Sequence, residues 1–404
     1  MYEESRSPQI ASHWARSAAA TLAALLALPT AGARADPDQP AAPAAAAPPA
    51  AAPAAAAATP PPPKWYDEIA FNAFVEAGYL FNTNRPSTRT NQLRPLDFPS
   101  NSFTVNVAEL SVQKAVADPG SFGFRTDLTF GGLYPQVTVS KGDIPGNFDL
   151  RQAFASWVAP VGSGLRFDVG KFVTPLGYEV LDGYDGYNDN NSRSFLFEFA
   201  IPFTHTGVKA TYAFSSMVSA MVGVVNGWDA TVAQTKPKSF VGQIALTPIA
   251  PLTVYLNYVG GWEPVTTTRN AFRQVFDAVV VLKATEHITV AANGDFGTED
   301  GTSTVTAGDN AKWYGGAGYI RYEMGSFGIA LRGEYFADKG GTRLGLGDTN
   351  VAEGTISPYF KPSDHLMFRL EGRYDHASNP VFLKSDGTLA NDQPTIGINA
   401  MAIY

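Results

Sequence analysis

Residues 366–375 show the pattern that most constrains how this chain can fold. Apolar and charged side chains alternate there, the apolar ones at Leu366, Phe368, Leu370 and Tyr374 and the charged ones at Arg369, Glu371, Arg373 and Asp375. Because side chains two apart on a strand point to the same side, such a strand has one apolar face and one charged face. Segments of this kind recur about sixteen times, which favours a closed barrel with lipid around its apolar face over a water-soluble sandwich.

Two segments precede the alternating part of the chain. Residues 1–35 have the plan of a secretory signal, with Arg6 and Arg16, an apolar stretch over 18–28 and small residues at 33–35. That stretch is too short to span a bilayer comfortably as an anchor helix, so we expect cleavage after residue 35. Residues 36–64 are rich in alanine and proline, which favours an extended periplasmic tether. Residues 65–404 then form one barrel domain.

The composition excludes several classes of function. The 404 residues include no cysteine, so disulfides and thiolate metal sites are excluded. The formal net charge of −8 argues against nucleic acid as a partner, because no basic patch is present to meet phosphates. Aromatic residues make up 12% of the chain and glycines number 38, which suits a sheet with tight turns and aromatic girdles at the membrane interfaces.

The lengths of the connections between strand-like segments predict the topology. Seven connections are very short and carry the Pro, Gly, Ser and Asp of tight hairpins, and they alternate with eight longer polar connections. This predicts an all-β, transmembrane antiparallel β-barrel of about sixteen strands, with short periplasmic turns, long external loops and both termini in the periplasm. Strands are expected to start near Ile69, Thr104, Phe122, Leu150, Leu165, His205, Met217, Ser239, Leu252, Phe272, His287, Lys312, Phe327, Val351, His365 and Thr395.

A recurring pair, an arginine two residues before an acid, marks the polar faces. The pairs are Arg125/Asp127, Arg166/Asp168, Arg321/Glu323, Arg332/Glu334, Arg369/Glu371 and Arg373/Asp375. The opposite faces are apolar, and an arginine facing lipid near the midplane would cost roughly 2–4 kcal/mol, so we expect these charges to line the lumen. Arg273 and Asp277 are candidates for the same wall. A barrel of about sixteen strands leaves an aqueous lumen; the alternative is that the pairs fill a plugged, non-conducting barrel.

The longest connection, residues 174–204, is the candidate constriction. Its polar residues include Tyr178, Glu179, Asp182, Asp185, Asp189 and Arg193. Folded inward on the apolar anchors Phe195, Phe197 and Phe199, the loop would narrow the pore, and its acids would favour cations. Folded outward, it would decorate the external surface, and the sequence leaves both arrangements open. The spacing of its three aspartates does not match a calcium-binding EF-hand.

No catalytic constellation stands out. His205 with Ser194 or Ser192 is nearest to the serine–histidine pair of a barrel lipase, but no third orienting residue accompanies them. The chain has neither a phosphate-binding glycine loop nor a His or Cys spacing typical of metal sites. We therefore expect no enzymatic activity, no cofactor and no bound metal.

Residues 170–207 resemble a known family. The segment begins GKFVTPLGYE at 170–179, continues with Asn190 and Arg193-Ser194, and ends AIPFTHTG at 200–207. It resembles the second group of putative β-barrel porins, the OmpL-like family of Gram-negative bacteria. The strand layout extends the resemblance to residues 65–404, whereas the motif-like part is 151–228. The resemblance implies an outer-membrane porin with a mostly undefined substrate, and the Ala/Pro tether departs from the family pattern.

Together these observations predict a passive diffusion channel for small hydrophilic solutes or ions, set in the lipid of the outer membrane. One alternative is a substrate-specific channel contacted by Tyr178, Tyr184 and Tyr187, and another is a non-conducting barrel that tethers the envelope. Terminal aromatic residues such as Tyr404 are typical of barrels recognised by the outer-membrane assembly machinery. By analogy with barrels of this size, we also expect a homotrimer.

Overall fold

The computed structural model describes residues 64, 66–138, 140–143 and 146–404. The expected signal peptide, residues 1–35, lies outside the described residues, as does the expected tether apart from Lys64 at its end. No helix in the described part of the chain has the length and apolarity needed to cross a membrane.

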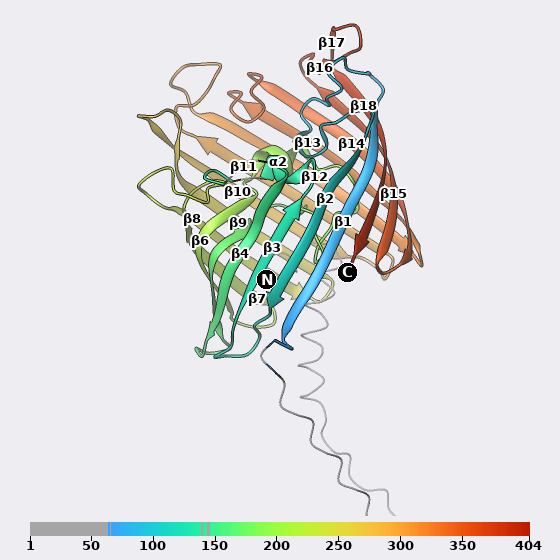
Figure 1. Cartoon of the computed structure of the whole chain (residues 1–404). Helices are drawn as coiled ribbons and strands as arrows, with labels where there is room; N and C mark the ends of the chain where they lie inside the picture. Colours follow the sequence, from blue (N-terminus) through green and yellow to red (C-terminus); the bar gives the residue numbers. More distant parts are fainter. Residues whose placement is uncertain (1–63, 65, 139, 144–145) are drawn as a thin grey trace, which may run out of the picture.

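Sixteen antiparallel strands of the described chain close into one barrel (Figure 1). They are β1 (Ile69–Asn82), β2 (Ser102–Lys114), β3 (Phe122–Phe130), β4 (Phe148–Ala159), β5 (Leu165–Val173), β6 (Thr204–Ala213), β7 (Val218–Val225), β8 (Ser239–Ile249), β9 (Leu252–Pro264), β10 (Asn270–Lys283), β11 (Ile288–Glu299), β12 (Ala311–Met324), β13 (Phe327–Lys339), β14 (Thr349–Ser363), β15 (Leu366–Ala377) and β18 (Asp392–Ile403). Two further strands, β16 (Phe382–Leu383) and β17 (Leu389–Ala390), form a separate hairpin between β15 and β18. The prediction of an all-β barrel of about sixteen strands is confirmed.

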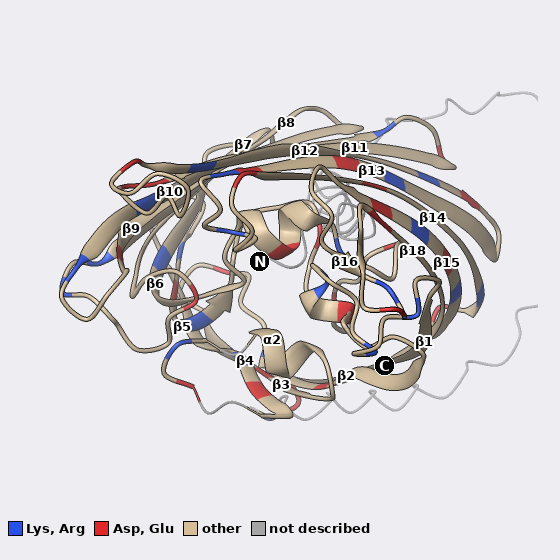
Figure 2. Cartoon of the chain, turned by 90° about the horizontal axis from the view of Figure 1, so that it is seen from above, with Lys and Arg blue, Asp and Glu red and all other residues tan. Residues whose placement is uncertain are grey.

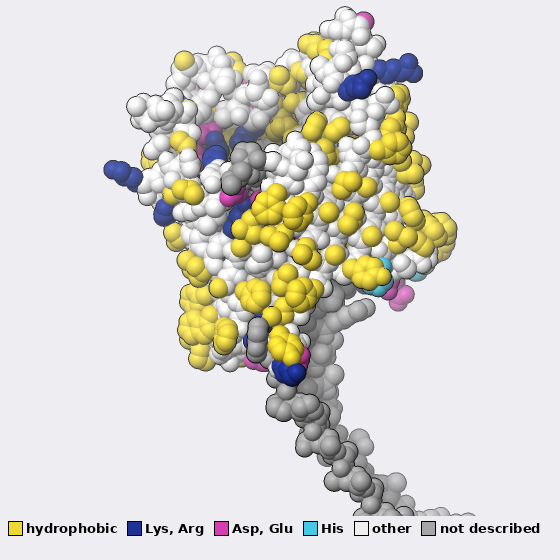
Figure 3. Space-filling model, viewed as in Figure 1, with side chains coloured by type: hydrophobic (Ala, Val, Ile, Leu, Met, Phe, Trp, Pro, Cys, Tyr) yellow, Lys and Arg dark blue, Asp and Glu magenta, His cyan; other side chains and the backbone are white. Residues whose placement is uncertain are grey.

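The outer wall carries the apolar residues of the alternating pattern. On β15, Leu370 and Tyr374 are each 51% exposed, whereas Arg369 and Glu371 are 1% and 2% exposed. Figure 3 shows apolar side chains spread over the wall that faces the viewer. An apolar outer wall on a barrel of this size suits the hydrocarbon of a bilayer.

The barrel closes where the two ends of the chain meet. β1 pairs with β18, so that Phe74 lies opposite Ile403, and the backbones of Ala73 and Tyr404 exchange two hydrogen bonds of 2.8 Å. The ring of Tyr404 stacks on His365 in the tight turn between β14 and β15, with ring centroids 5.0 Å apart. The first and last strands of the barrel therefore meet at the end of the barrel that carries the tight turns.

Candidate functional site

Residues 174–203, between β5 and β6, fold into the barrel. Seen from above, irregular segments and short helices lie inside the ring of strands (Figure 2). The loop contains a one-turn π-helix, η3 (Leu196–Ala200), and Phe195, Leu196 and Phe197 are 0–3% exposed. The indole N–H of Trp313, on β12, donates to the carbonyl of Ala200 at 3.0 Å. Of the two arrangements that the sequence left open, the structure has the inward one.

The wall of the barrel is shaped to receive this loop. Gly297 on β11 faces the indole of Trp313, and a Cβ at Gly297 would lie 2.0 Å from the Trp313 ring. A side chain at position 297 would therefore displace Trp313, which would also weaken its hydrogen bond to Ala200. The lack of a side chain at Gly297 on β11 thus leaves room for Trp313 on β12, which binds the loop.

Arginines of β13 and β15 bind the loop backbone. Arg332 donates to the carbonyl of Ser192 at 2.6 Å, and Arg369 donates to the carbonyl of Asn188 at 2.5 Å. Arg373 donates to a third loop carbonyl, also at 2.5 Å. The three guanidinium groups supply partners for backbone carbonyls that would otherwise be buried without any.

The acids of the same strands accept hydrogen bonds from the loop. Glu334 accepts the N–H groups of Phe195 and Leu196 at 2.5 and 3.1 Å, and Glu371 accepts those of residues 191 and 192 at 2.6 and 3.1 Å. Asp375 pairs with Arg373 at 2.5 Å. These side chains point into the barrel, and half of the expected lumen pairs lie beneath the loop and do not face open lumen. The reason is that a buried loop needs hydrogen-bond partners from the wall.

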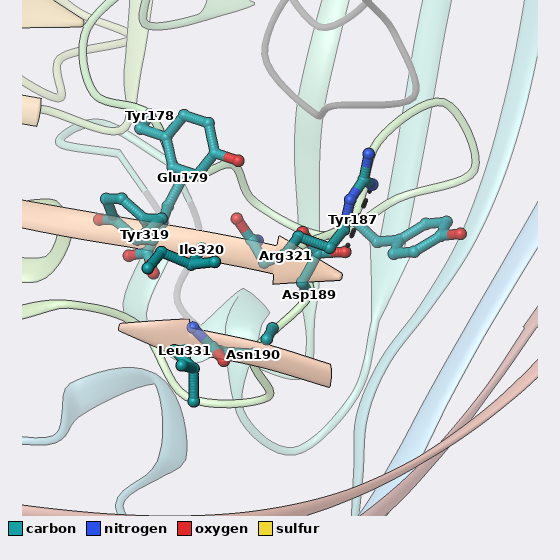
Figure 4. A pocket seen from close by; sticks show the side chains of 11 residues that line it. Tyr178, Glu179, Tyr187, Asp189, Asn190, Tyr319, Ile320, Arg321 and Leu331 are labelled. Carbon is teal, nitrogen blue, oxygen red and sulfur yellow. Dashed lines mark ion pairs between the residues drawn. The ribbon is translucent and has the colours of Figure 1, made fainter. Parts of the chain in front are cut away.

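Four of the five acids of the loop lie against an arginine, and the fifth, Glu198, accepts a backbone N–H. The pairs are Glu179–Arg332 at 2.6 Å, Asp182–Arg193 at 2.5 Å, Asp185–Arg125 at 2.5 Å and Asp189–Arg321 at 3.7 Å (Figure 4). Asp182 and its partner Arg193 are both fully buried. The arginines offset much of the negative charge that the loop brings into the lumen, so its acids attract cations less than the sequence alone suggests.

Three clusters of charged side chains inside the barrel, one of them including the loop residue Asp185, remain in part accessible. The side chains of Arg166, Arg321 and Glu323 are 16%, 11% and 30% exposed. The clusters are Arg166 with Asp168 and Lys209, Arg125 with Asp127 and Asp185, and Arg321 with Glu323 and Lys361. On the β10 wall, Arg273 pairs with Glu299 at 2.8 Å and Asp277 accepts from Asn293 at 2.6 Å.

A second inward segment, residues 83–101 between β1 and β2, was not expected from the sequence. Arg94, which is 1% exposed, forms an ion pair with Asp375 at 3.2 Å and another with Asp97. The N–H of Leu96 donates to Glu198 of the longer loop at 3.1 Å. The sequence signal that could have indicated an inward fold is the presence of apolar residues in this otherwise polar segment, such as Leu96, which is 2% exposed.

Two tryptophans enclose an arginine beside η3, where the arginine donates to the carbonyl of Phe199 at 2.5 Å. The guanidinium of Arg343 lies 5.0 Å from the ring of Trp228 and 5.2 Å from that of Trp313. Burial, with a smaller contribution from the nearby Arg273, lowers the pKa of Arg343 to about 10. Burial likewise raises the pKa of Asp229, whose carboxylate accepts the N–H groups at the end of the loop at 2.6 and 3.0 Å.

The histidine and serines considered for a lipase bind different partners. The Nε2 of His205 lies 3.1 Å from the hydroxyl of Thr174. Ser194 donates to Glu179 at 2.7 Å, while the hydroxyl of Ser192 accepts from Arg332 at 3.1 Å. In the described residues, no group of three or more His, Cys, Asp or Glu is arranged to hold a metal ion.

A family model described as "Putative beta-barrel porin-2, OmpL-like" matches residues 68–403. This chain belongs to that family. The match covers all sixteen strands of the barrel, so the family resemblance seen over residues 151–228 extends to the whole domain. The protein is an outer-membrane porin, a channel whose solute the family does not specify. No curated protein sequence matches this porin.

Solved structures with the same fold are outer-membrane channels of distant sequence. The channel DcaP of Acinetobacter baumannii is 11% identical, with a TM-score of 0.58 over 83% of this porin and 97% of DcaP. An anion-selective porin from Comamonas acidovorans is 9% identical, with a TM-score of 0.58 over 83% and 99% of the two chains. OmpF of Salmonella typhi is 9% identical, with a TM-score of 0.58 over 84% and 99%. At these identities the likeness shows the fold alone.

Proposed function

We propose that this porin is a passive, non-catalytic diffusion channel for small hydrophilic solutes or ions. The observation that carries the proposal is the set of wall charges that the loops leave partly accessible, namely those around Arg166 and Arg321. Charges of both signs beside water stabilise hydrated solutes along a narrow path. The inward loop makes that path narrower than the ring of strands, and Tyr178 to Arg193 are its constriction.

The experiment is single-channel recording of the purified porin in planar bilayers. A diffusion channel gives steady ohmic current, whereas silence from well-folded protein would favour a structural barrel that tethers the envelope. Reversal potentials in a salt gradient then report charge preference. Comparing wild type with an Asp182→Asn, Asp185→Asn variant measures what these two loop acids contribute. An unchanged potential would remove them from the selectivity mechanism.

We also propose the route by which the porin reaches the outer membrane. Residues 1–35 serve as a cleaved signal, and Tyr404 serves as the contact for the barrel assembly machinery. The exposure of Tyr404, at 78%, supports a role in recognition by a partner. Sequencing the N-terminus of the mature protein tests the cleavage, with Asp36 expected first.

A homotrimer is the proposed assembly. Six outward-facing glycines on β11 to β15 leave a shallow strip where a second wall can approach closely, at Gly294, Gly316, Gly318, Gly333, Gly354 and Gly372. Light scattering in detergent is expected to give three times the protomer mass. A Gly333→Trp substitution should shift the mass to that of one protomer, whereas Val169→Trp, on the outer face of β5, should leave the trimer intact.

A further inference from the structure

Two lysines lie opposite each other on the outer wall, at the end of the barrel that carries the long loops (Figure 1). Lys312 lies at the start of β12 and Lys339 at the end of β13, and the two are direct partners in the register of this strand pair. Their chain neighbours Trp313 and Asp338 are buried inside the barrel, so the alternation of the strands turns both lysines outward. Lys312 is exposed and Lys339 is half-buried.

This pairing places two positive charges side by side. Directly opposite residues have Cβ atoms about 4.5–5.5 Å apart, and like charges in such positions are destabilising. Neither lysine forms an ion pair with a residue that the structure describes. Asp348, in the loop that follows β13, instead accepts the N–H of Gly340 at 2.7 Å. An anion bound between the two ammonium groups would relieve their repulsion.

A row of polar side chains continues from Lys312 across the neighbouring strands. Thr298 on β11 lies opposite Lys312, and Gln274 on β10 lies opposite Thr298. Gln274 accepts a hydrogen bond from the hydroxyl of Tyr258 at 3.1 Å and donates to the hydroxyl oxygen of Thr298 at 3.3 Å. Because this oxygen acts as an acceptor, the Thr298 hydroxyl still has its hydrogen to donate beside Lys312. The lysines and this hydroxyl together suit an anion with several acceptor oxygens.

The row lies at the height expected for lipid headgroups. Two residues nearer the tight turns, the exposed rings of Phe276, Phe296 and Tyr314 lie opposite one another on β10, β11 and β12. Aromatic residues form girdles where the apolar band of a membrane barrel ends. Twelve residues separate Lys312 from Met324 at the tight turn. At about 3.4 Å per residue and a tilt of about 40°, this distance is a height of roughly 31 Å, just beyond an apolar band of about 25 Å.

We propose that Lys312 and Lys339 bind a phosphate group of an anionic lipid in the external leaflet, with Thr298 as a third donor. The phosphate supplies the negative charge and the acceptor oxygens that this row lacks. The acyl chains of the lipid lie along the aromatic and apolar wall below, a contact that a free anion cannot make. Both lysines lie beyond Gly316 and Gly333 toward the loops, so the lipid lies at the external edge of the proposed trimer contact. Its binding does not depend on conduction through the lumen.

The test is the binding of lipid A that carries two phosphates to the full mature porin in non-ionic detergent, measured by native mass spectrometry. Binding is expected to saturate. Lys312→Met and Lys339→Met should each raise the dissociation constant about fivefold, as for the loss of one lysine beside an anionic lipid, and the double variant should raise it at least tenfold. The matched control is Lys236→Met with Lys238→Met, which removes two exposed lysines from the loop before β8. This control should leave the dissociation constant unchanged.

Two further probes identify the group that is bound. Lipid A from which both phosphates have been removed should bind at least tenfold more weakly, and equal binding would show a contact with acyl chains alone and overturn the proposal. Inorganic phosphate in molar excess should not displace lipid A, and displacement would show a site for a free anion. An equal loss of binding in the Lys236 and Lys238 control would show general attraction to positive charge and also overturn the proposal. If the double variant does not fold, Lys312→Gln with Lys339→Gln takes its place.

Discussion

Replacing Arg332 with methionine should release the inward loop from the wall. Arg332 forms ion pairs with Glu179 and Glu353, both at 2.6 Å, and donates to the carbonyl of Ser192 at 2.6 Å. Its side chain is fully buried, so its removal leaves two buried carboxylates without their main partner. Removing one partner of a buried ion pair typically costs about 3–5 kcal/mol. Because Glu179 keeps its hydrogen bond from Ser194 and Glu353 keeps its contact with Arg373, we expect the lower end of this range, about 3 kcal/mol.

The assay is the rate at which a membrane-impermeant thiol reagent labels a single cysteine. The natural chain has no cysteine, so Ser192→Cys provides a reporter that is 1% exposed in the docked loop. We take the labelling rate to be proportional to the fraction of molecules in which the loop is undocked. A destabilisation of the docked loop by about 3 kcal/mol then raises the labelling rate roughly 10²-fold in the Arg332→Met background, because each 1.4 kcal/mol corresponds to a factor of ten. Arg166→Met is the control, because Arg166 pairs with Asp168 on β5. A rise of less than tenfold, or an equal rise with Arg166→Met, would refute the reasoning.

Three further predictions concern the barrel itself. Gly297→Ala should displace the indole of Trp313 and lower the free energy of unfolding by about 1–3 kcal/mol. The measurement is the temperature at which the folded barrel loses its faster mobility on gels, which should be lower for the variant than for the wild type. Leu370→Arg places a charge on the lipid face and should cost roughly 2–4 kcal/mol in urea titrations in lipid vesicles, whereas Glu371→Gln on the opposite face should leave the barrel membrane-inserted. Tyr404→Ala removes the stacking on the neighbouring turn and should lower the yield of folded barrel in lipid vesicles, with an unchanged yield arguing that closure depends on the backbone bonds alone.

Local alternation was sufficient to predict the barrel, because each strand needs only its own sequence to present one apolar and one charged face. The predicted strand starts agree closely with the structure; the largest difference is at β18, expected from Thr395 and observed from Asp392. Short turns predict the pairing of neighbours because a tight hairpin leaves its two strands no other partner.

The interior of the barrel could not be predicted in the same way. Arg369 and Arg166 have the same local pattern, but one is covered by a loop and the other is in part accessible. What separates them is contact with residues far away in sequence, such as the carbonyl of Asn188, and no periodic pattern encodes that contact. Arg94 was missed for the same reason, because its partner Asp375 lies near the other end of the chain.

The central claim is that lipid surrounds the apolar outer wall while the loop-bearing interior stays away from lipid. Quenching of tryptophan fluorescence by lipids with brominated acyl chains tests it directly, in variants that retain one tryptophan each. Trp157 and Trp262 are 48% and 44% exposed on the outer wall, whereas Trp228 and Trp313 are 6% and 0% exposed. We predict strong quenching for the first two and little for the last two. Equal quenching of all four, or stronger quenching of Trp313 than of Trp262, would contradict the account.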